Sequence, residues 1–190
     1  MRRIRFALVT LACAAALTGG AAADAAVSQP KATTDVPAQQ TAMQNVSFMT
    51  GDWVGTGWNL GSNGVRDYFT QTENVHYQVQ GTVLLVEGQG YEVTDPAKVA
   101  DSALAVLTYN DTTQQYRWEA FSGGNIVQSV PVVGDDTFQW SLQFPHVIIR
   151  YTLTFTARTW HEIGETSVDG GQTWSQTFQQ DLVRLGLATG

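Results

Sequence analysis

Three carboxylates, those of Glu73, Glu87 and Glu162, could do acid–base chemistry or orient a ligand. Glu73 and Glu87 flank residues 79–81 (Val-Gln-Gly), a turn signal between two runs rich in Val, Tyr and Leu. If these three residues form the turn, Glu73 lies opposite Glu87 on a face whose other cross-strand neighbours are apolar. Glu162 follows Trp160 by two residues and therefore shares a strand face with it. Carboxylates that face each other in an interior raise the pKa of at least one of them, unless a cation lies between.

Arg66 and Arg150 are the cations available to this group. Strict alternation puts Arg150 on the polar face of its strand, so it would need a β-bulge to reach the interior. Three interpretations of the hairpin stay open. It could hold an interior polar patch that orients a ligand or acts as general acid and base. The register could be shifted by one residue, which sets Glu73 opposite Gly88 and turns one carboxylate outward. Finally, the patch could be a buried ion pair with a structural role only.

Aromatic residues on the apolar strand faces are the second chemical signal. In a barrel of eight to ten strands the interior is wide enough for one small ligand, and these rings either line such a pocket or fill it. We predict that Trp118, Trp140 and Tyr151 contact the apolar part of a ligand. The polar groups of the ligand are expected to meet Glu73, Glu87, Arg150 and Glu162.

No other pattern in the sequence predicts a catalytic residue, a metal site or a cofactor. His76, His146 and His161 are isolated and lack the spacing of metal ligands. No serine sits in a G-x-S-x-G frame, and no glycine-rich phosphate loop precedes a helix. Residues 167–174 (SVDGGQTW) fit the Asp-box pattern of sialidase-type propellers, but the box occurs once. We interpret it as a hairpin turn that the Asp side chain caps.

The elements that must position these residues are antiparallel strands. From Gly51 onward, short runs rich in β-branched and aromatic residues alternate with turn signals, and almost no helical period is present. A short helix or 3₁₀ turn is expected at 42–48. Strands with one apolar face and short hairpins form a barrel or a sandwich, so the fold class is all-β. The expected strands, about ten in all, are 52–60, 65–78, 82–93, 103–109, 115–122, 126–133, 137–144, 147–156, 160–167 and 173–185. Pro131 lies within the run 126–133 and suggests a sheet edge or a bulge there.

Two motifs favour a barrel. Gly51-Asp52-Trp53 opens the first long strand and Arg184 lies on the last, so closure of a barrel brings the guanidinium over the indole ring. This pairing resembles the lipocalin/calycin superfamily, in which such a Trp plugs the closed end of the barrel. The chain is similar, over roughly residues 44–186, to DUF1579-type proteins, through FMTGDWVGTGW, LLVEGQGY, LTYNDTTQQYRWEAF, IIRYT and WHEIGETSVDGGQTW. That resemblance implies a single antiparallel lipocalin-like barrel but no activity. The haem-binding nitrobindin-like group shares the Gly-x-Trp opening, but its proximal His does not map onto any histidine here.

The N-terminus resembles a secretory signal peptide. A basic stretch at 1–5 precedes an apolar run at 6–17, and A-x-A sites follow near Ala23. We expect a signal peptide at 1–23, a flexible leader at 24–41 and one domain at 42–190; an uncleaved anchor is the alternative. Cys13, the only cysteine, lies in the apolar run, and lipidation there stays open. The expected location is the periplasm or the extracellular space.

Charge excludes some partners. The sequence contains ten Lys and Arg and seventeen Asp and Glu, which gives a net charge of −7, and no basic stripe is present. We therefore expect neither nucleic acid nor, after signal cleavage, a membrane as partner. The predicted function is binding of a small apolar or amphipathic molecule in the barrel, with the oligomeric state open. One alternative is a carboxylate-dependent isomerase, cyclase or lyase. Another is an interaction module that uses a strand edge near Pro131.

Overall fold

Alternating apolar and polar side chains make strands of most of residues 51–184. The computed structural model describes residues 34–186, which contain one α-helix and one antiparallel sheet of eleven strands. The strands are β1 (Gly51–Leu60), β2 (Arg66–Gln78), β3 (Val83–Glu92), β4 (Val99–Asn110), β5 (Gln115–Ser122), β6 (Asn125–Ser129), β7 (Val132–Gly134), β8 (Thr137–Gln143), β9 (Ile148–Phe155), β10 (Thr159–Ser167) and β11 (Ser175–Arg184). The all-β prediction is confirmed. The count exceeds ten because the run 126–133 divides at Pro131, which has no N–H for a ladder.

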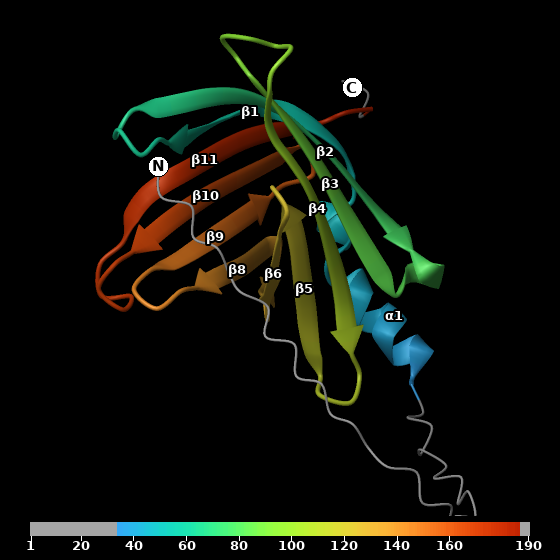
Figure 1. The fold of residues 1–190 in the computed structure, drawn as a ribbon. Coiled ribbons are helices and arrows are strands. Elements are labelled where there is room, and N and C mark those ends of the chain that lie inside the picture. Colours follow the sequence, from blue (N-terminus) through green and yellow to red (C-terminus); the bar gives the residue numbers. More distant parts are fainter. Residues whose placement is uncertain (1–33, 187–190) are drawn as a thin grey trace, which may run out of the picture. The chain divides into compact units, whose positions relative to one another are not determined.

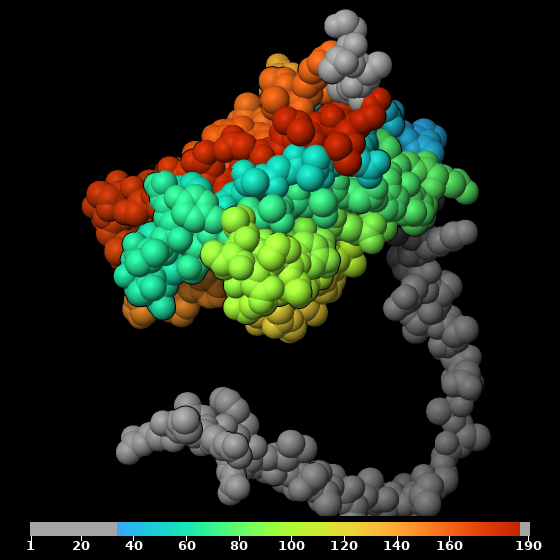
Figure 2. Space-filling model, turned by 90° about the horizontal axis from the view of Figure 1, so that it is seen from above, coloured from blue at the N-terminus to red at the C-terminus, as the bar shows by residue number. Residues whose placement is uncertain are grey.

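The sheet curls so that the first and last strands are neighbours. The strand order is β6-β5-β4-β3-β2-β1-β11-β10-β9-β8-β7, and β1 pairs with β11 with Trp53 opposite Arg184. Figure 1 shows the curvature, and in Figure 2 red β11 lies against cyan β1 along the surface. The described chain is therefore a curled half-barrel whose two edges are β6 and β7.

The seam between those two edges is bridged without a backbone ladder. In residues 34–186, β6 pairs only with β5 and β7 only with β8. The chain crosses from one edge to the other through Val130 and buried Pro131. Ser129 Oγ accepts a hydrogen bond of 3.2 Å from the backbone N–H of Ser141. The Trp118 ring packs across the seam at a centroid distance of 5.1 Å from that of Phe138. The edge predicted at the proline is confirmed.

The helix α1 (Val36–Gln44) and the following turn η1 (Ser47–Met49) cover one end of the half-barrel (Figure 1). The Asp35 carboxylate caps α1 by accepting a hydrogen bond of 3.0 Å from the N–H of Ala38. The Tyr77 hydroxyl donates to the Met43 carbonyl at 2.6 Å, which ties the helix to β2, and Met43 is fully buried. The predicted leader 24–41 thus overlaps α1. The signal peptide and Cys13 lie outside the described residues, and no helix in 34–186 is long and apolar enough to cross a membrane.

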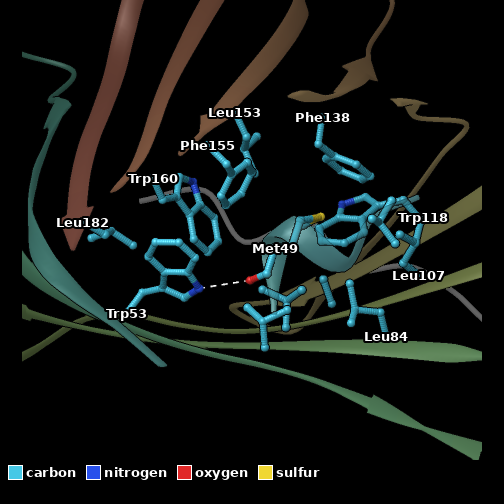
Figure 3. Close-up of a cluster of buried hydrophobic side chains, with 14 of the residues drawn as sticks. Met49, Trp53, Leu84, Leu107, Trp118, Phe138, Leu153, Phe155, Trp160 and Leu182 are labelled. Carbon is cyan, nitrogen blue, oxygen red and sulfur yellow. Dashed lines mark hydrogen bonds between the residues drawn. The ribbon is translucent and has the colours of Figure 1, made fainter. Parts of the chain in front are cut away.

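Trp53 fills this end of the interior, as the resemblance implied. It is 1% exposed, and its indole N–H donates to the Met49 carbonyl at 3.0 Å (Figure 3). The Arg184 guanidinium carbon lies 4.1 Å from the Trp53 ring centroid, and its nitrogens donate to the carbonyls of Phe48 and Thr50. The contact predicted between the two motifs is confirmed. Arg184 therefore joins β11, β1 and η1 at one point.

Candidate functional site

Part of the remaining interior is hollow. A cavity of about 410 Å³ lies inside the curled sheet, and Met49 of η1 lines it together with the inward side chains of most strands. Its polar lining residues are Asn59, Gln71, Glu73, Asp101, Ser122, Asn125, Tyr151, Glu162 and Gln180, and its rings are Phe69, Trp118, Trp140, Trp160 and Phe178. The interior thus combines an aromatic wall with two carboxyl groups that are buried.

Glu73 reaches this cavity from β2 because a glycine stands opposite it. Glu73 pairs with Gly88 of β3, and a Cβ at Gly88 would lie 2.8 and 2.9 Å from the two carboxylate oxygens. The Gln71 side chain, two residues earlier on the same face, donates to Glu73 Oε1 at 2.8 Å. Burial raises the pKa of Glu73 to about 7; the hydrogen bond from Gln71 lowers it, and the charge of Asp101 raises it further.

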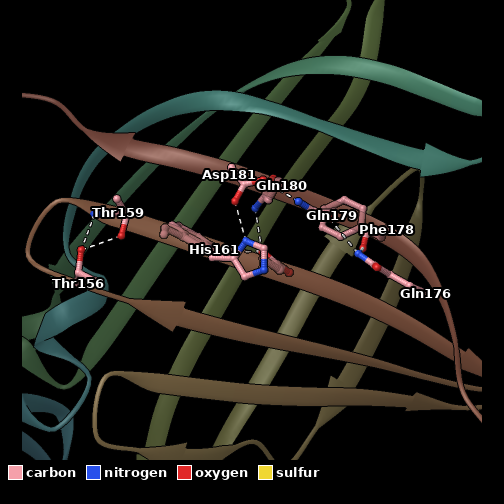
Figure 4. Close-up of polar contacts among 10 residues, drawn as sticks. Thr156, Thr159, His161, Gln176, Phe178, Gln179, Gln180 and Asp181 are labelled. Carbon is pink, nitrogen blue, oxygen red and sulfur yellow. Dashed lines mark hydrogen bonds and ion pairs between the residues drawn. The ribbon is translucent and has the colours of Figure 1, made fainter.

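Glu162 lines the same cavity from β10, which is separated from β2 by β1 and β11 in the sheet. It is 7% exposed, and its Oε2 accepts hydrogen bonds from Gln180 at 2.7 Å and from the Trp160 indole at 3.2 Å. Figure 4 shows Gln180 on β11, beside β10. Burial raises the pKa of Glu162 to about 8, and the charge of Glu73 contributes in the same direction. At neutral pH Glu162 is therefore mostly protonated in this cavity.

Both carboxyl groups keep one oxygen without a partner. Glu73 Oε2 and Glu162 Oε1 take part in no hydrogen bond with residues 34–186. Asp101, at the exposed rim, is bonded through Oδ1 to the Ser122 hydroxyl at 2.8 Å. Among the described residues that line the cavity there is no Lys, Arg or His. Its charged groups are acidic only.

The aromatic wall is a chain of rings in contact. Trp140 and Tyr151 stack with centroids 4.5 Å apart, and Trp118 lies 5.9 Å from Trp140. Tyr151 also meets Phe178 edge to face at 5.6 Å. Burial raises the pKa of Tyr151 to about 12, so its hydroxyl stays neutral. The placement of Trp118, Trp140 and Tyr151 inside the half-barrel is as predicted, while ligand contact stays a prediction.

The placement predicted for Glu87 was wrong by one residue of register. Asn74, not Glu73, lies opposite Glu87, which therefore points outward with 55% of its side chain exposed. The reason is the turn, in which Val79 and Gln80 adopt left-handed φ values of 48° and 56°. The N–H of Thr82 bonds to the Val79 carbonyl, so Thr82 belongs to the turn and the ladder starts one residue later. The one-residue shift left open by the sequence is the arrangement found.

Arg150 also lies outside the cavity, because β9 has no bulge that would turn it inward. Its guanidinium donates two hydrogen bonds to Glu165 Oε2, at 2.7 and 3.1 Å. Its carbon also lies 4.0 Å from the Trp174 ring centroid. Arg66, the other candidate cation, covers the outward Trp58 ring at 3.8 Å. Neither arginine compensates the interior carboxyl groups.

The sequence prediction missed Gln71 and Gln180, although the signal was present. Gln71 precedes Glu73 by two residues, and Gln180 precedes the buried Leu182 by two, so period-two alternation places both inside. Gly88 packs closely against the carboxylate of Glu73.

The remaining motifs take no part in the cavity. His76 and His161 lie on the outer face, hydrogen-bonded to Asn74 and Asp181, and the cavity lining within residues 34–186 contains no histidine. Residues 34–186 contain no group of three or more His, Cys, Asp and Glu side chains that could hold a metal ion. The Asp box is a structural turn: Asp169 accepts from the backbone and hydroxyl of Thr173, which holds the pKa of Asp169 at about 2.

Comparison with known proteins supports the fold. No family model matches the sequence, and no curated protein sequence does. Rv2717c from M. tuberculosis superimposes with a TM-score of 0.58 at 15% identity, covering 76% of this chain and 98% of that one. The S-type phycobiliprotein lyase CPES from Guillardia theta does so with a TM-score of 0.56 at 8% identity, covering 82% and 99%. These two likenesses support a lipocalin-like fold for the half-barrel. Membership of the DUF1579 group stays a prediction.

Proposed function

We propose that this protein binds one small, partly apolar molecule in the cavity of the half-barrel. The observation that carries the proposal is the 410 Å³ hollow that joins an aromatic wall to two buried carboxyl groups with unpartnered oxygens. Ligand sites are commonly about 300–1,000 Å³, mostly apolar, and contain a few polar groups that converge. The cavity has each of these properties.

The energetics support a binding role over a structural one. Burying a carboxyl group without a compensating cation destabilises a fold, and Glu73 and Glu162 are both buried without one. Apolar residues would fill the same strand positions at lower cost in free energy. Groups that are kept despite such a cost cluster at functional sites. The polar patch is thus expected to serve a ligand.

A fluorescent probe tests the proposal. N-phenyl-1-naphthylamine, which is apolar and uncharged at neutral pH, should bind saturably at one site per chain and receive energy from the tryptophans that line the cavity. Ala103→Phe places a ring in the cavity, whereas Leu104→Phe places the same ring on the outer face of the same strand. We expect the first variant to weaken probe binding by about tenfold or more and the second to leave it unchanged. Equal binding by both variants, or no saturable binding by the parent, contradicts the proposal.

Native mass spectrometry of protein isolated from its own cells supplies the physiological ligand. The expected result is a reproducible adduct that organic extraction removes. An adduct that persists in Ala103→Phe and is absent from Leu104→Phe would place the molecule elsewhere.

We infer in addition that the chain is exported and is a DUF1579-type protein. The basic and apolar segments before the A-x-A sites support export, and the quoted motifs support the family. The N-terminus of the protein recovered from cells is the test. A start near residue 24 in the periplasm or medium is expected, and a chain that begins at Met1 in the cytosol would contradict export.

An acid–base enzyme is the second candidate function, with Glu73 and Glu162 as the proton-transfer groups. It is supported by their pKa values of about 7 and about 8, which are close to the range in which general acids and bases work. Incubating the recovered ligand with protein in D₂O tests it. Deuterium should enter a carbon position of the ligand with the parent protein and not with Glu162→Gln; absence of exchange with both would refute it.

A further inference from the structure

We infer that the ligand is an organic cation, whose ammonium group lies between Glu73 and Glu162 and whose apolar body lies along the Trp118–Trp140–Tyr151 wall. The inference rests on the proposed binding function and specifies the chemical class of the molecule. It is carried by the sign of the charges around the cavity and by the oxygens left unpartnered.

The charged groups that face the cavity come from three strands and are all acidic. They are Glu73 of β2, Asp101 of β4 and Glu162 of β10, and Tyr151 of β9 is the remaining titratable group. The arginines that could have compensated them are held on the outer face by Glu165 and Trp58. Where these carboxyls are ionised, an anionic ligand would meet like charge at short range and no compensating cation. The ionised cavity therefore disfavours anionic ligands.

Hydrogen bonding distinguishes a cation from a neutral ligand. The side-chain amides of Gln71 and Gln180 each donate to one oxygen of a carboxyl group, at 2.8 and 2.7 Å, and the Trp160 indole adds a third donor at 3.2 Å. These donors stabilise the ionised form of each carboxylate. The other oxygen of each group has no partner among residues 34–186 and is free to accept a hydrogen bond. An ammonium group has three donors and no acceptor, so it complements a pair of such oxygens, and a charged hydrogen bond is stronger than a neutral one.

The pH dependence of binding follows from the same groups. A cation binds best when Glu73 and Glu162 are ionised, so its affinity should rise with pH through the range in which these two carboxyls lose their protons. Tyr151 titrates at about 12, so its hydroxyl does not change charge in this range. A neutral ligand that accepts hydrogen bonds from protonated carboxyls would show the opposite trend.

Three eight-carbon compounds provide the test: octylamine, octanol and octanoate. Tryptophan fluorescence reports their binding, since Trp118, Trp140 and Trp160 line the cavity. We expect octylamine to bind about tenfold or more tightly than octanol at about pH 8.5, and octanoate to bind most weakly. Between about pH 6 and 8.5 the dissociation constant of octylamine should fall about fivefold or more, with proton release in calorimetry.

Variants locate the effect. Glu162→Gln keeps the shape of the side chain and removes its charge, so it should abolish the preference for the amine while octanol still binds. Glu73→Gln is expected to do the same and covers the case in which the first variant does not fold. Glu87→Gln is the matched control, because Glu87 lies on the outer face and is largely exposed. It should leave all three dissociation constants unchanged.

The outcomes separate this inference from the binding function. If N-phenyl-1-naphthylamine binds but octanol equals or exceeds octylamine, or the affinity for octylamine falls as pH rises, the ligand is not a cation although the cavity binds a ligand. If the probe binds and none of the three compounds does, the cation inference is likewise overturned. If neither the probe nor any of the three compounds binds saturably, the proposed function fails and the inference fails with it.

Discussion

Replacing Glu162 with glutamine should make the protein more stable at alkaline pH and leave it unchanged in acid. The pKa of Glu162 is about 8 in the folded chain and about 4.5 when the group is exposed. Below about pH 4.5 the carboxyl is protonated in both states and contributes no penalty. As pH rises from there to about 8, the unfolded state loses the proton while the folded state keeps it, so the free energy of unfolding falls.

The magnitude follows from the two pKa values. One pKa step corresponds to about 1.4 kcal/mol, so ionising Glu162 in place costs on the order of 5 kcal/mol at pH 9. Part of this cost is repulsion from Glu73, whose own pKa of about 7 implies a further penalty on the order of 3 kcal/mol. Because the two penalties share the repulsion, they are not additive. A few kcal/mol of difference between Glu162→Gln and the parent at pH 9 is the expected result.

Urea unfolding followed by tryptophan fluorescence at pH 5, 7 and 9 measures this difference. The parent should lose stability steadily over the range, and Glu162→Gln should lose less. Glu87→Gln is the control, because it makes the same substitution at an outward, mostly exposed position. Parallel pH dependences for the parent and Glu162→Gln, or a variant less stable than the parent at pH 9, would refute the argument from burial.

Three further substitutions test the close packing at Gly88, the buried Trp53 and the turn that Asp169 caps. Gly88→Ala should lower the free energy of unfolding in urea by about 1–3 kcal/mol, because the new Cβ would lie 2.8 Å from a Glu73 oxygen. Adding Glu73→Ala to that variant should recover most of the loss, and no recovery would show that the clash lies elsewhere. Trp53→Phe removes the indole bond to the Met49 carbonyl, so about 1–3 kcal/mol of stability should be lost in thermal unfolding, and an unchanged midpoint contradicts this. The pKa of Asp169 is held at about 2, so the stabilisation from its carboxylate is present above about pH 4 and disappears as pH falls to 2. Asp169→Asn should therefore make the thermal unfolding midpoint less dependent on pH over that range. An unaltered pH dependence argues against a capping role.

The general arrangement of strands could be predicted from local patterns. Alternation over 137–144 and 147–156 marked both the strands and their inward faces, because a half-buried strand imposes a period of two. The contact between Trp53 and Arg184 was predictable as well, since closure of the sheet brings the first strand to the last. These features depend on residue type and order alone.

The composition of the polar site depended on details that the sequence does not specify. A hairpin connection of three residues and one of four are equally compatible with the residues after Gln78, yet the choice decides whether Glu87 points inward. The left-handed backbone at Val79 could not be foreseen, because β-branched residues rarely adopt it. The partner of Glu73 inside the cavity, Glu162, lies 89 positions further along the chain, and only the curvature of the whole sheet brings them to one cavity.

The missing ladder between β6 and β7 determines where this protein is easiest to deform. Elsewhere in the half-barrel, moving two neighbouring strands apart breaks a row of backbone hydrogen bonds. At β6 and β7 the same displacement disrupts the aromatic packing of Trp118 on Phe138 and one hydrogen bond to the Ser129 hydroxyl. The circumference can therefore expand at this point while every strand keeps its paired neighbours, so amide protons of β6 and β7 should exchange with solvent ahead of those of β1 and β11.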